Sequence, residues 1–483
     1  MSGPEPALAT SGARGAVVTL AGQVVMVATR VVGLAVLARL LTPEIYGLMA
    51  IATGFSTFAV AVTTLGLPMA IAGAAEISRR AQSTLFFLSL AFGVVVGGVI
   101  ALAAPLIANL WGEPQLEPVL RWLALAPVMG SALGIFQLHL ARQLRFVAVA
   151  AVGTVATVTS FALAIAVAAG GGGIEALVVQ TLSMPAIELI LLAIVGRWLP
   201  GRPHRLGADE RALIRNARHL LGINVLGQTG RYVTAPMLGL VAPPTQVGLF
   251  DRAQQLVLLP LGLTIDQMKR VALPVLTRVR DDRERLASYY RRAQQLATYG
   301  TGLLFALLAA LAEPVVAVVF GSGWEAAVPL LRVLALGGIV RAFGLTVQWL
   351  HMGGGSAQAG LRFNAWAIPL VVAITATGLP WGAMGVAVAN GVGWLVYWPL
   401  AVRDGARAVG IPAAPVMADA VRVSLTVLAP TAVAAWAASS LVEGAWPMLL
   451  LGSAAALAVL GVAFVALARV RADVTSLVAM VRG

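Results

Sequence analysis

Long apolar runs fill most of the chain, and short polar segments separate them. The runs last about 20 residues or more and lack the alternation of a strand, which is typical of helices that cross a bilayer. We predict fourteen such helices, with boundaries that are accurate to within several residues. Their expected ranges are 15–41, 45–74, 83–110, 119–140, 147–169, 174–198, 220–241, 247–276, 293–320, 326–350, 359–377, 382–402, 417–441 and 446–468.

The arginines fall in alternate connectors between these helices, and the intervening connectors carry acids or no charge. Arg39 and Arg121 are exceptions to this alternation. Because basic connectors stay in the cytoplasm, the pattern predicts an even number of spans and places both termini in the cytoplasm. Tryptophans at predicted helix ends are typical of the two membrane interfaces. They are Trp111, Trp324, Trp381 and Trp446 at outer ends and Trp198 and Trp398 at inner ends.

A local repeat indicates two related halves. Arg30 precedes Pro43 and Gly47 at the same spacings by which Arg231 precedes Pro244 and Gly248. We therefore predict an all-α integral membrane protein of two six-helix lobes in a parallel repeat, followed by two C-terminal helices. The expected divisions are a cytoplasmic N-terminus (1–14), an N-lobe (15–199), a cytoplasmic connector with a short amphipathic helix (200–219), a C-lobe (220–402), the last two helices (417–468) and a cytoplasmic tail (469–483).

Composition confirms the membrane class, because 59% of the 483 residues are hydrophobic and only 11% are charged. Soluble domains average about 25% charged residues. The net charge of +13 would suggest a nucleic-acid partner in a soluble protein, but here it resides in loop arginines. The chain has no cysteine, and its four histidines are scattered. We therefore expect no disulfide, metal site or cofactor, and no nucleic-acid partner.

Cations within the predicted spans are the first candidates for function, since a charge at the centre of a span costs about 2.5–3.5 kcal/mol. Arg30 and Arg231 lie deep in the first and seventh helices, and Arg332 and Arg341 lie in the tenth. We predict a cationic cavity between the two halves that holds an anionic headgroup such as a phosphate. The alternative is a structural role, in which the arginines pair with acids or with carbonyls at helix breaks.

Uncharged polar and acidic residues within the spans are further candidates. Glu188 in the sixth helix and Asp251 and Asp266 in the eighth are candidates for ion coupling. Asp251 and Arg252 are neighbours about 100° apart on a helix, so we expect no face-to-face pair. Six amides could bind sugar hydroxyls or bridge neighbouring helices. They are Gln23, Asn224, Gln228, Gln348, Asn364 and Asn390.

Three stretches resemble the Wzx-type polysaccharide flippases of the multidrug/oligosaccharidyl-lipid/polysaccharide exporter superfamily. They are LARLLTPEIYGLMAIA (37–52), VGLFDRAQQLVLLPLGLTIDQMKRVALPVLTRVRDDRERL (247–286) and VVFGSGWEAAVPLLRVLAL (318–336). The resemblance implies fourteen helices in two lobes around a cationic cavity, in the bacterial cytoplasmic (inner) membrane. It also implies that polyprenyl-pyrophosphate-linked oligosaccharides move from the inner to the outer leaflet by alternating access, without ATP. Arg30 matches an arginine often found in the family's first span, whereas Gly230-Arg231-Tyr232 lacks the acid that the family often has midway along the seventh.

Other functions remain open at this stage. A multidrug or peptidoglycan-precursor exporter would have the same fold, and a non-transporting partner of a polysaccharide assembly complex would have the same composition. A membrane polymerase or glycosyltransferase would need a large outer loop or a D-x-D pair, and neither is present in the sequence. The chain also has no P-loop, HExxH or nucleophile elbow, so we expect no enzyme. A polysaccharide polymerase and glycosyltransferases are expected partners, together with membrane lipid.

Overall fold

The computed structural model describes residues 5–63, 78–143, 145–204, 207 and 232–482, and within these it contains helices and no strand. The chain divides into two compact units, Met1–Leu240 and Val241–Gly483. Ten helices among the described residues are long and apolar enough to cross a membrane, or eleven if a bent pair counts as one span. The all-helical multi-span class is therefore confirmed.

The exact number of fourteen spans remains a prediction. Two long helices, α1 (Glu5–Leu40) and α11 (Pro244–Arg278), lie outside the set of ten. The predicted seventh helix (220–241) and the amphipathic helix expected at 200–219 fall mostly outside the described residues.

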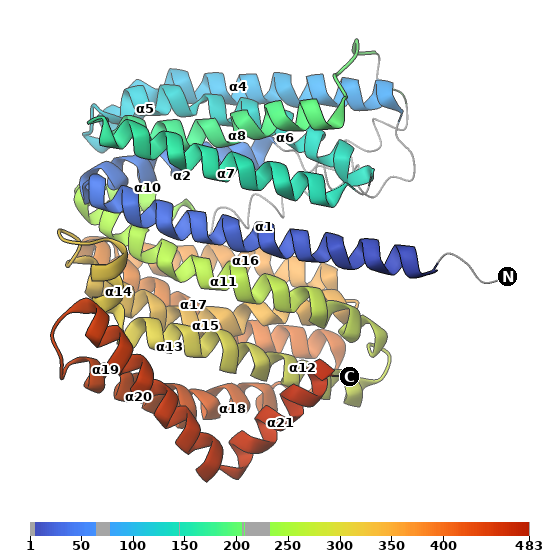
Figure 1. The fold of residues 1–483 in the computed structure, drawn as a ribbon, viewed down its shortest axis with the longest axis vertical. Helices are drawn as coiled ribbons and strands as arrows, with labels where there is room; N and C mark the ends of the chain where they lie inside the picture. Colours follow the sequence, from blue (N-terminus) through green and yellow to red (C-terminus); the bar gives the residue numbers. More distant parts are fainter. Residues whose placement is uncertain (1–4, 64–77, 144, 205–206, 208–231, 483) are drawn as a thin grey trace. The chain divides into compact units, whose positions relative to one another are not determined.

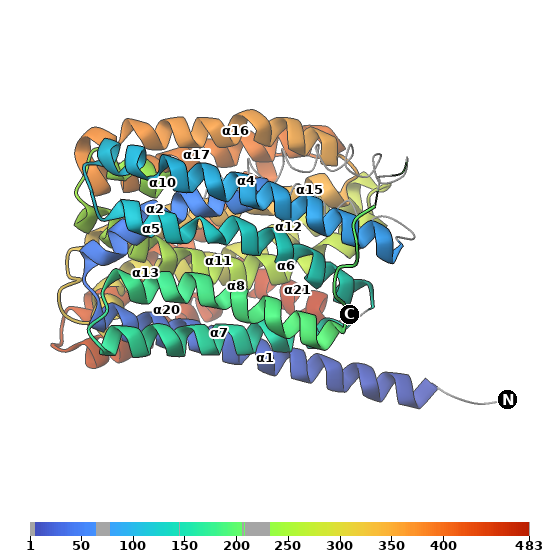
Figure 2. The same ribbon diagram turned by 90° about the horizontal axis from the view of Figure 1, so that it is seen from above.

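In the first unit, α7 packs against both α1 and α8 (Figure 2). The helices α4 and α6 also pack tightly, because Gly93 and Gly97 on α4 let the two backbones approach. A Cβ at Gly97 would contact the carbonyl oxygen of Ala124, and small residues at such crossings are typical of membrane helices. Besides α1, the described part of this unit contains the helices α2 (Pro43–Thr63), α4 (Arg79–Trp111), α5 (Leu116–Leu123), α6 (Leu125–Arg142), α7 (Phe146–Ala169), α8 (Ile174–Gly196) and α10 (Thr234–Gly239).

In the second unit, α15 is the central helix and packs against α11, α13 and α17. Glycines bring α15 and α17 together, since a Cβ at Gly337 would lie 3.1 Å from the Cα of Gly391. The helices that follow α11 are α12 (Arg283–Ala297), η1 (Thr298–Gly302), α13 (Leu303–Ala310), α14 (Ala312–Val319), α15 (Ala327–Gly353), α16 (Ala357–Thr377), η2 (Leu379–Trp381), α17 (Gly382–Val409), α18 (Ala414–Val423), η3 (Ser424–Leu428), α19 (Ala429–Ser439), α20 (Ala445–Ala466) and α21 (Ala468–Arg482).

The repeated prolines begin corresponding helices in the two units. Pro43 is the first residue of α2 and Pro244 is the first residue of α11. Proline suits this position because its missing N–H would have no helical partner there and its φ is already helical. Gly47 and Gly248 are both buried one turn later. The proline and glycine of the local repeat thus occupy the same places in α2 and α11, whereas Arg231 lies outside the described residues.

The ninth span differs from its predicted range of 293–320. Helix begins at Arg283, because Asp282 caps it by accepting a hydrogen bond from the Arg285 N–H at 3.1 Å and because Leu286 and Tyr290 are buried. The chain then bends by 81° between α13 and α14. Pro314 lies in the first turn of α14, where the lack of an N–H is tolerated, and a helix continuing through it would lose a hydrogen bond.

The C-terminal tail, predicted only as a cytoplasmic segment, forms α21. It turns away from α20 at the extended residue Leu467 (Figure 1) and contacts α12. The interfacial position of the tryptophans remains a prediction, and their burial differs. Trp381 and Trp446 are exposed, whereas Trp198, Trp324 and Trp398 are buried in the packing of their own units.

Candidate functional site

A buried guanidinium lies halfway along α15. Arg341 is 8% exposed, and its Cζ lies 4.7 Å from the centre of the Trp394 ring on α17. Stacking of a desolvated arginine on an indole contributes about 2 kcal/mol, which offsets much of the cost of a charge at this depth. The two helices come this close because Gly344 has no Cβ, and one built there would lie 2.9 Å from the Tyr397 ring. Arg341 is thus a cation held inside the second unit.

Next to Trp394 on α17 lies Tyr397, which forms a hydrogen bond with α16. The Trp394 and Tyr397 rings lie 5.1 Å apart, and the Tyr397 hydroxyl donates to Asn364 Oδ1 at 2.8 Å. Asn364 Nδ2 in turn donates to the Gly360 carbonyl at 2.9 Å. Asn364 therefore bridges α16 and α17, which is one of the two roles predicted for the amides from the sequence. Sequence reasoning missed Trp394 and Tyr397, although their spacing of three residues places them on one helix face.

Two other predicted residues of the second unit form exposed or local pairs. Arg332 lies 3.7 Å from Glu313 on α14, and the two side chains are 39% and 61% exposed, so this ion pair contributes little to stability. The expectation that Asp251 and Arg252 do not pair is wrong. Arg252 Nε donates to Asp251 Oδ2 at 3.1 Å, because the long arginine side chain folds back along the helix and spans the angle between the two residues.

In the first unit, Glu188 on α8 is buried, with 7% exposure, next to α6. Its Oε1 accepts a hydrogen bond from Gln137 Nε2 at 2.7 Å. A second polar cluster lies further along α6, where His139 Nδ1 lies 3.1 Å from Gln82 Oε1 and the imidazole stacks on Trp198. Glu188 is therefore a buried acid with a defined donor, which suits either ion coupling or helix bridging.

The first unit also has a basic pocket of about 530 Å³ at the start of α4 and the end of α8. Its charged lining consists of Arg79, Arg80, Arg197 and Arg202. His204 closes one side, and its backbone N–H donates to Thr84 Oγ1 at 3.0 Å. The sequence analysis used the arginines of the connectors only to assign the cytoplasmic side of the membrane, and it predicted no pocket here.

Arg30 lies within α1, and its side chain is exposed. The proposed partner positions are not described. Arg231, Asn224 and Gln228 lie outside the described residues, as do the side chains of Gln23 and Asp266.

The segment between α14 and α15 is a tight turn, and it lies within the third stretch of the family resemblance. Gly321 and Gly323 have φ values of 84° and 88°, which favour glycine. The Glu325 carboxylate accepts from the Gly323 N–H at 3.1 Å. The hydrogen bond from its own backbone N–H and the bond from Gly323 hold the pKa of Glu325 below its usual value. The stretch thus has a structural role in forming the turn.

Comparison with known sequences agrees with the family resemblance. A sequence model of the family described as "Polysaccharide biosynthesis protein" matches residues 36–329. The chain is 23% identical over 367 residues to lipopolysaccharide biosynthesis protein WzxC of Escherichia coli (strain K12), covering 75% of this chain and 74% of that protein. It is 26% identical over 366 residues to succinoglycan biosynthesis transport protein ExoT of Rhizobium meliloti (strain 1021), covering 74% and 72%.

Solved structures share the fold at low sequence identity. A structure of lipid II flippase MurJ in an inward closed conformation superposes with a TM-score of 0.72 at 12% identity, covering 93% of this chain and 98% of that one. An inward-facing multidrug resistance transporter of the MATE family gives a TM-score of 0.62 at 15% identity, covering 81% and 98%. The chain is therefore a multi-pass membrane protein with the helical fold of these transporters.

Proposed function

Because this chain belongs to the polysaccharide biosynthesis protein family, we propose that it moves polyprenyl-pyrophosphate-linked oligosaccharide from the inner to the outer leaflet of the bacterial cytoplasmic membrane. The family match carries this proposal, since it covers more than half of the chain. Two relatives support it by their names, one a lipopolysaccharide biosynthesis protein and the other a succinoglycan transport protein. A fold shared with a lipid II flippase agrees with a lipid-linked cargo.

The cargo would be recognised through its charge and its hydroxyl groups. A pyrophosphate in a low-dielectric interior needs fixed cations, and the planar guanidinium forms paired hydrogen bonds to phosphate oxygens. We assign this role to Arg30 and Arg231, and we assign contacts with the glycan to Gln23, Asn224 and Gln228. Alternating access would then expose the loaded site to one leaflet at a time.

Arg341 and Arg332 are weaker candidates for cargo binding. Arg341 is already stacked on Trp394, and Arg332 lies near Glu313. Ion coupling would fall to Glu188 or Asp266, since Asp251 is paired with Arg252. The arginine distribution supports a cytoplasmic location for both termini. Glycosyltransferases would supply the substrate at the inner leaflet, and a polymerase would consume it at the outer leaflet.

A complementation experiment tests the anion site. Arg30→Ala and Arg30→Lys would be expressed in cells that lack their own flippase, with the exposed Arg469→Ala as the matched control. Loss of one charged hydrogen-bonding partner weakens binding by about 1.5–3 kcal/mol, so surface polysaccharide should fall about tenfold or more in Arg30→Ala. Arg30→Lys should reduce surface polysaccharide less than Arg30→Ala does, since lysine keeps the positive charge but lacks the paired N–H donors of the guanidinium.

Two outcomes would count against the proposal. Full restoration of surface polysaccharide by both Arg30 variants would remove the anion site. Vesicles containing the purified protein that move no lipid-linked oligosaccharide would indicate a non-transporting partner, and drug efflux in its place would indicate a multidrug exporter.

A further inference from the structure

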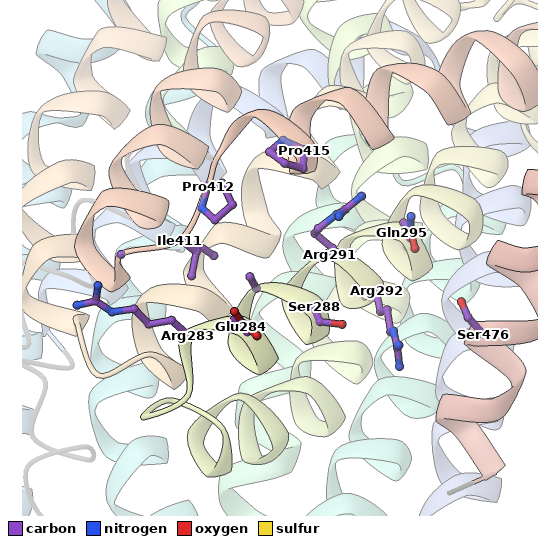
Figure 3. Close-up of a pocket in the computed structure, with 12 residues that line it drawn as sticks. Arg283, Glu284, Ser288, Arg291, Arg292, Gln295, Ile411, Pro412, Pro415 and Ser476 are labelled. Atoms are coloured by element: carbon purple, nitrogen blue, oxygen red, sulfur yellow. The ribbon is translucent and has the colours of Figure 1, made fainter.

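A basic pocket of about 610 Å³ opens in the second unit, between α12, the turn from α17 to α18 and the C-terminal helix α21 (Figure 3). Arg283, Arg291 and Arg292 supply three guanidiniums, and Glu284 is the one acid among its lining residues. Ile411, Pro412 and Pro415 form an apolar wall beside them. We propose that this pocket binds the phosphate headgroup of an anionic phospholipid.

The basic side of the pocket follows from the helical repeat of α12. Arg283, Ala287, Arg291 and Gln295 recur every four residues and so share one face of the helix. The flank of the helix next to this stripe carries Leu286 and Tyr290, which are fully buried. Burial of these two side chains fixes the rotation of α12, and Arg283, Arg291 and Arg292 of the same helix line the pocket (Figure 3).

One guanidinium is held in place before any ligand arrives. Arg291 donates to Asp419 Oδ2 on α18 through Nε at 3.0 Å and Nη2 at 2.7 Å. Asp419 also lies 3.7 Å from Arg422, which itself donates to Asp473 on α21 at 2.8 Å. This chain of ion pairs joins the three helices around the pocket, so the pocket walls are connected to one another.

A second guanidinium is placed by a glycine. Gly410 ends α17 with a φ of 74°, and a Cβ there would lie 3.1 Å from Arg283 Cζ. The missing side chain leaves room for Arg283 over the C-terminal end of α17, where a cation is favoured by the helix dipole. Arg292, by contrast, is exposed and has no ion pair with a described residue, so its charge is available to a ligand.

The combination of charge and apolar wall favours a lipid over a soluble phosphate. A phosphate alone needs only the guanidiniums, whereas a phospholipid also places its glycerol and first acyl carbons against apolar side chains. The pocket lies beside the segment that joins α11 to α12, where Arg278 ends α11 and Arg280 follows it. Such connectors face the cytoplasmic leaflet, where anionic lipids are common and basic pockets bind their headgroups. The site is independent of the cargo of the proposed transport function.

The test compares two variants of the full-length protein in nanodiscs, titrated with short-chain phosphatidylglycerol. Arg283→Gln/Arg292→Gln removes two guanidiniums and keeps the Arg291–Asp419 pair. Arg285→Gln is the matched control, because Arg285 lies on the same helix outside the pocket with a side chain that is 75% exposed. We expect the double variant to bind about tenfold more weakly or worse, with the control unchanged.

Equal binding by the double variant and the control would overturn the proposal. Competition by glycerol 3-phosphate at the same concentration as the lipid would assign the pocket to a soluble phosphate and overturn the lipid assignment. Should the double variant fail to fold, Arg292→Gln alone decides, because its side chain is exposed. Unchanged lipid binding in that variant contradicts the proposal, and a loss of about threefold or more supports it.

Discussion

Two substitutions in the pair formed by Glu188 and Gln137 test separately the contribution of the buried acid's charge and the contribution of its hydrogen bond. Gln137 Nε2 lies 2.7 Å from Glu188 Oε1, and Glu188 is buried within the candidate span Ile174–Gly196. In Glu188→Gln, the amide oxygen can still accept from Gln137, while the charged form and its desolvation are lost. In Gln137→Leu, the acid keeps its charge but loses this donor.

The expected energies differ in a way that can be measured. A hydrogen bond to a charged group contributes about 1.5–3 kcal/mol, so Gln137→Leu should lower the free energy of unfolding by about that amount. Glu188→Gln exchanges a charged acceptor for a neutral one and avoids the burial of a carboxylate, so its change should stay below about 1 kcal/mol. Reversible unfolding in mixed micelles would give both values.

Transport by the same variants then tests ion coupling. If Glu188 couples an ion to transport, Glu188→Gln should lose most of the dependence of transport on a pH or sodium gradient while remaining stably folded. Gln137→Leu should keep that dependence. Wild-type transport by Glu188→Gln under every gradient would refute a coupling role. An unchanged unfolding free energy in Gln137→Leu would refute the energetic reasoning.

Two further predictions concern the second unit. Asp473 accepts hydrogen bonds from Arg422 and from the Tyr299 hydroxyl at 2.8 and 2.9 Å, so Asp473→Asn should destabilise the docking of α21 by about 2 kcal/mol. Tryptic cleavage at Arg471 should then accelerate about 30-fold, and an unchanged rate would contradict this. Glu325→Gln should lower the melting temperature slightly at pH 7. Since the pKa of Glu325 is below its ordinary value of 4.5 in the folded protein, its stabilising effect is present above that value and is lost as the pH falls through the folded pKa. A difference in melting temperature that is as large at pH 3 as at pH 7 would contradict this.

The apolar pattern predicted the helical class well because the length and hydropathy of a span are properties of the local sequence. The helices that start at Pro43 and Pro244 begin two and three residues before the predicted starts at 45 and 247, because proline is tolerated at a first helical position. The arginine-rich segment after α11 was harder to predict. Its charges favour a connector, yet the burial of Leu286 and Tyr290 makes its second part the helix α12.

Partners of buried polar residues could not be predicted, because they lie far apart in the sequence. Gln137 and Glu188 are 51 residues apart, and Arg291 and Asp419 are 128 apart. A single sequence contains no signal for such pairs. The pairing of Arg252 with Asp251 was missed for another reason, since helix geometry fixes where the Cβ atoms point but not where a long side chain ends.

The buried polar pairs bear on how a transporter of this kind could move. Glu188 bonds within the first unit, and Tyr397 bonds within the second. Neither bond has to break if each unit moves as a rigid body, which is how many transporters alternate access. Breaking such a pair would leave a polar group unsatisfied in a low-dielectric interior, at a cost of about 1–3 kcal/mol each. Internal bonding of this kind makes deformation within a unit less favourable than a movement that preserves it. The residues that change partners during transport should therefore be sought among exposed cations such as Arg30 rather than in the cores of the units.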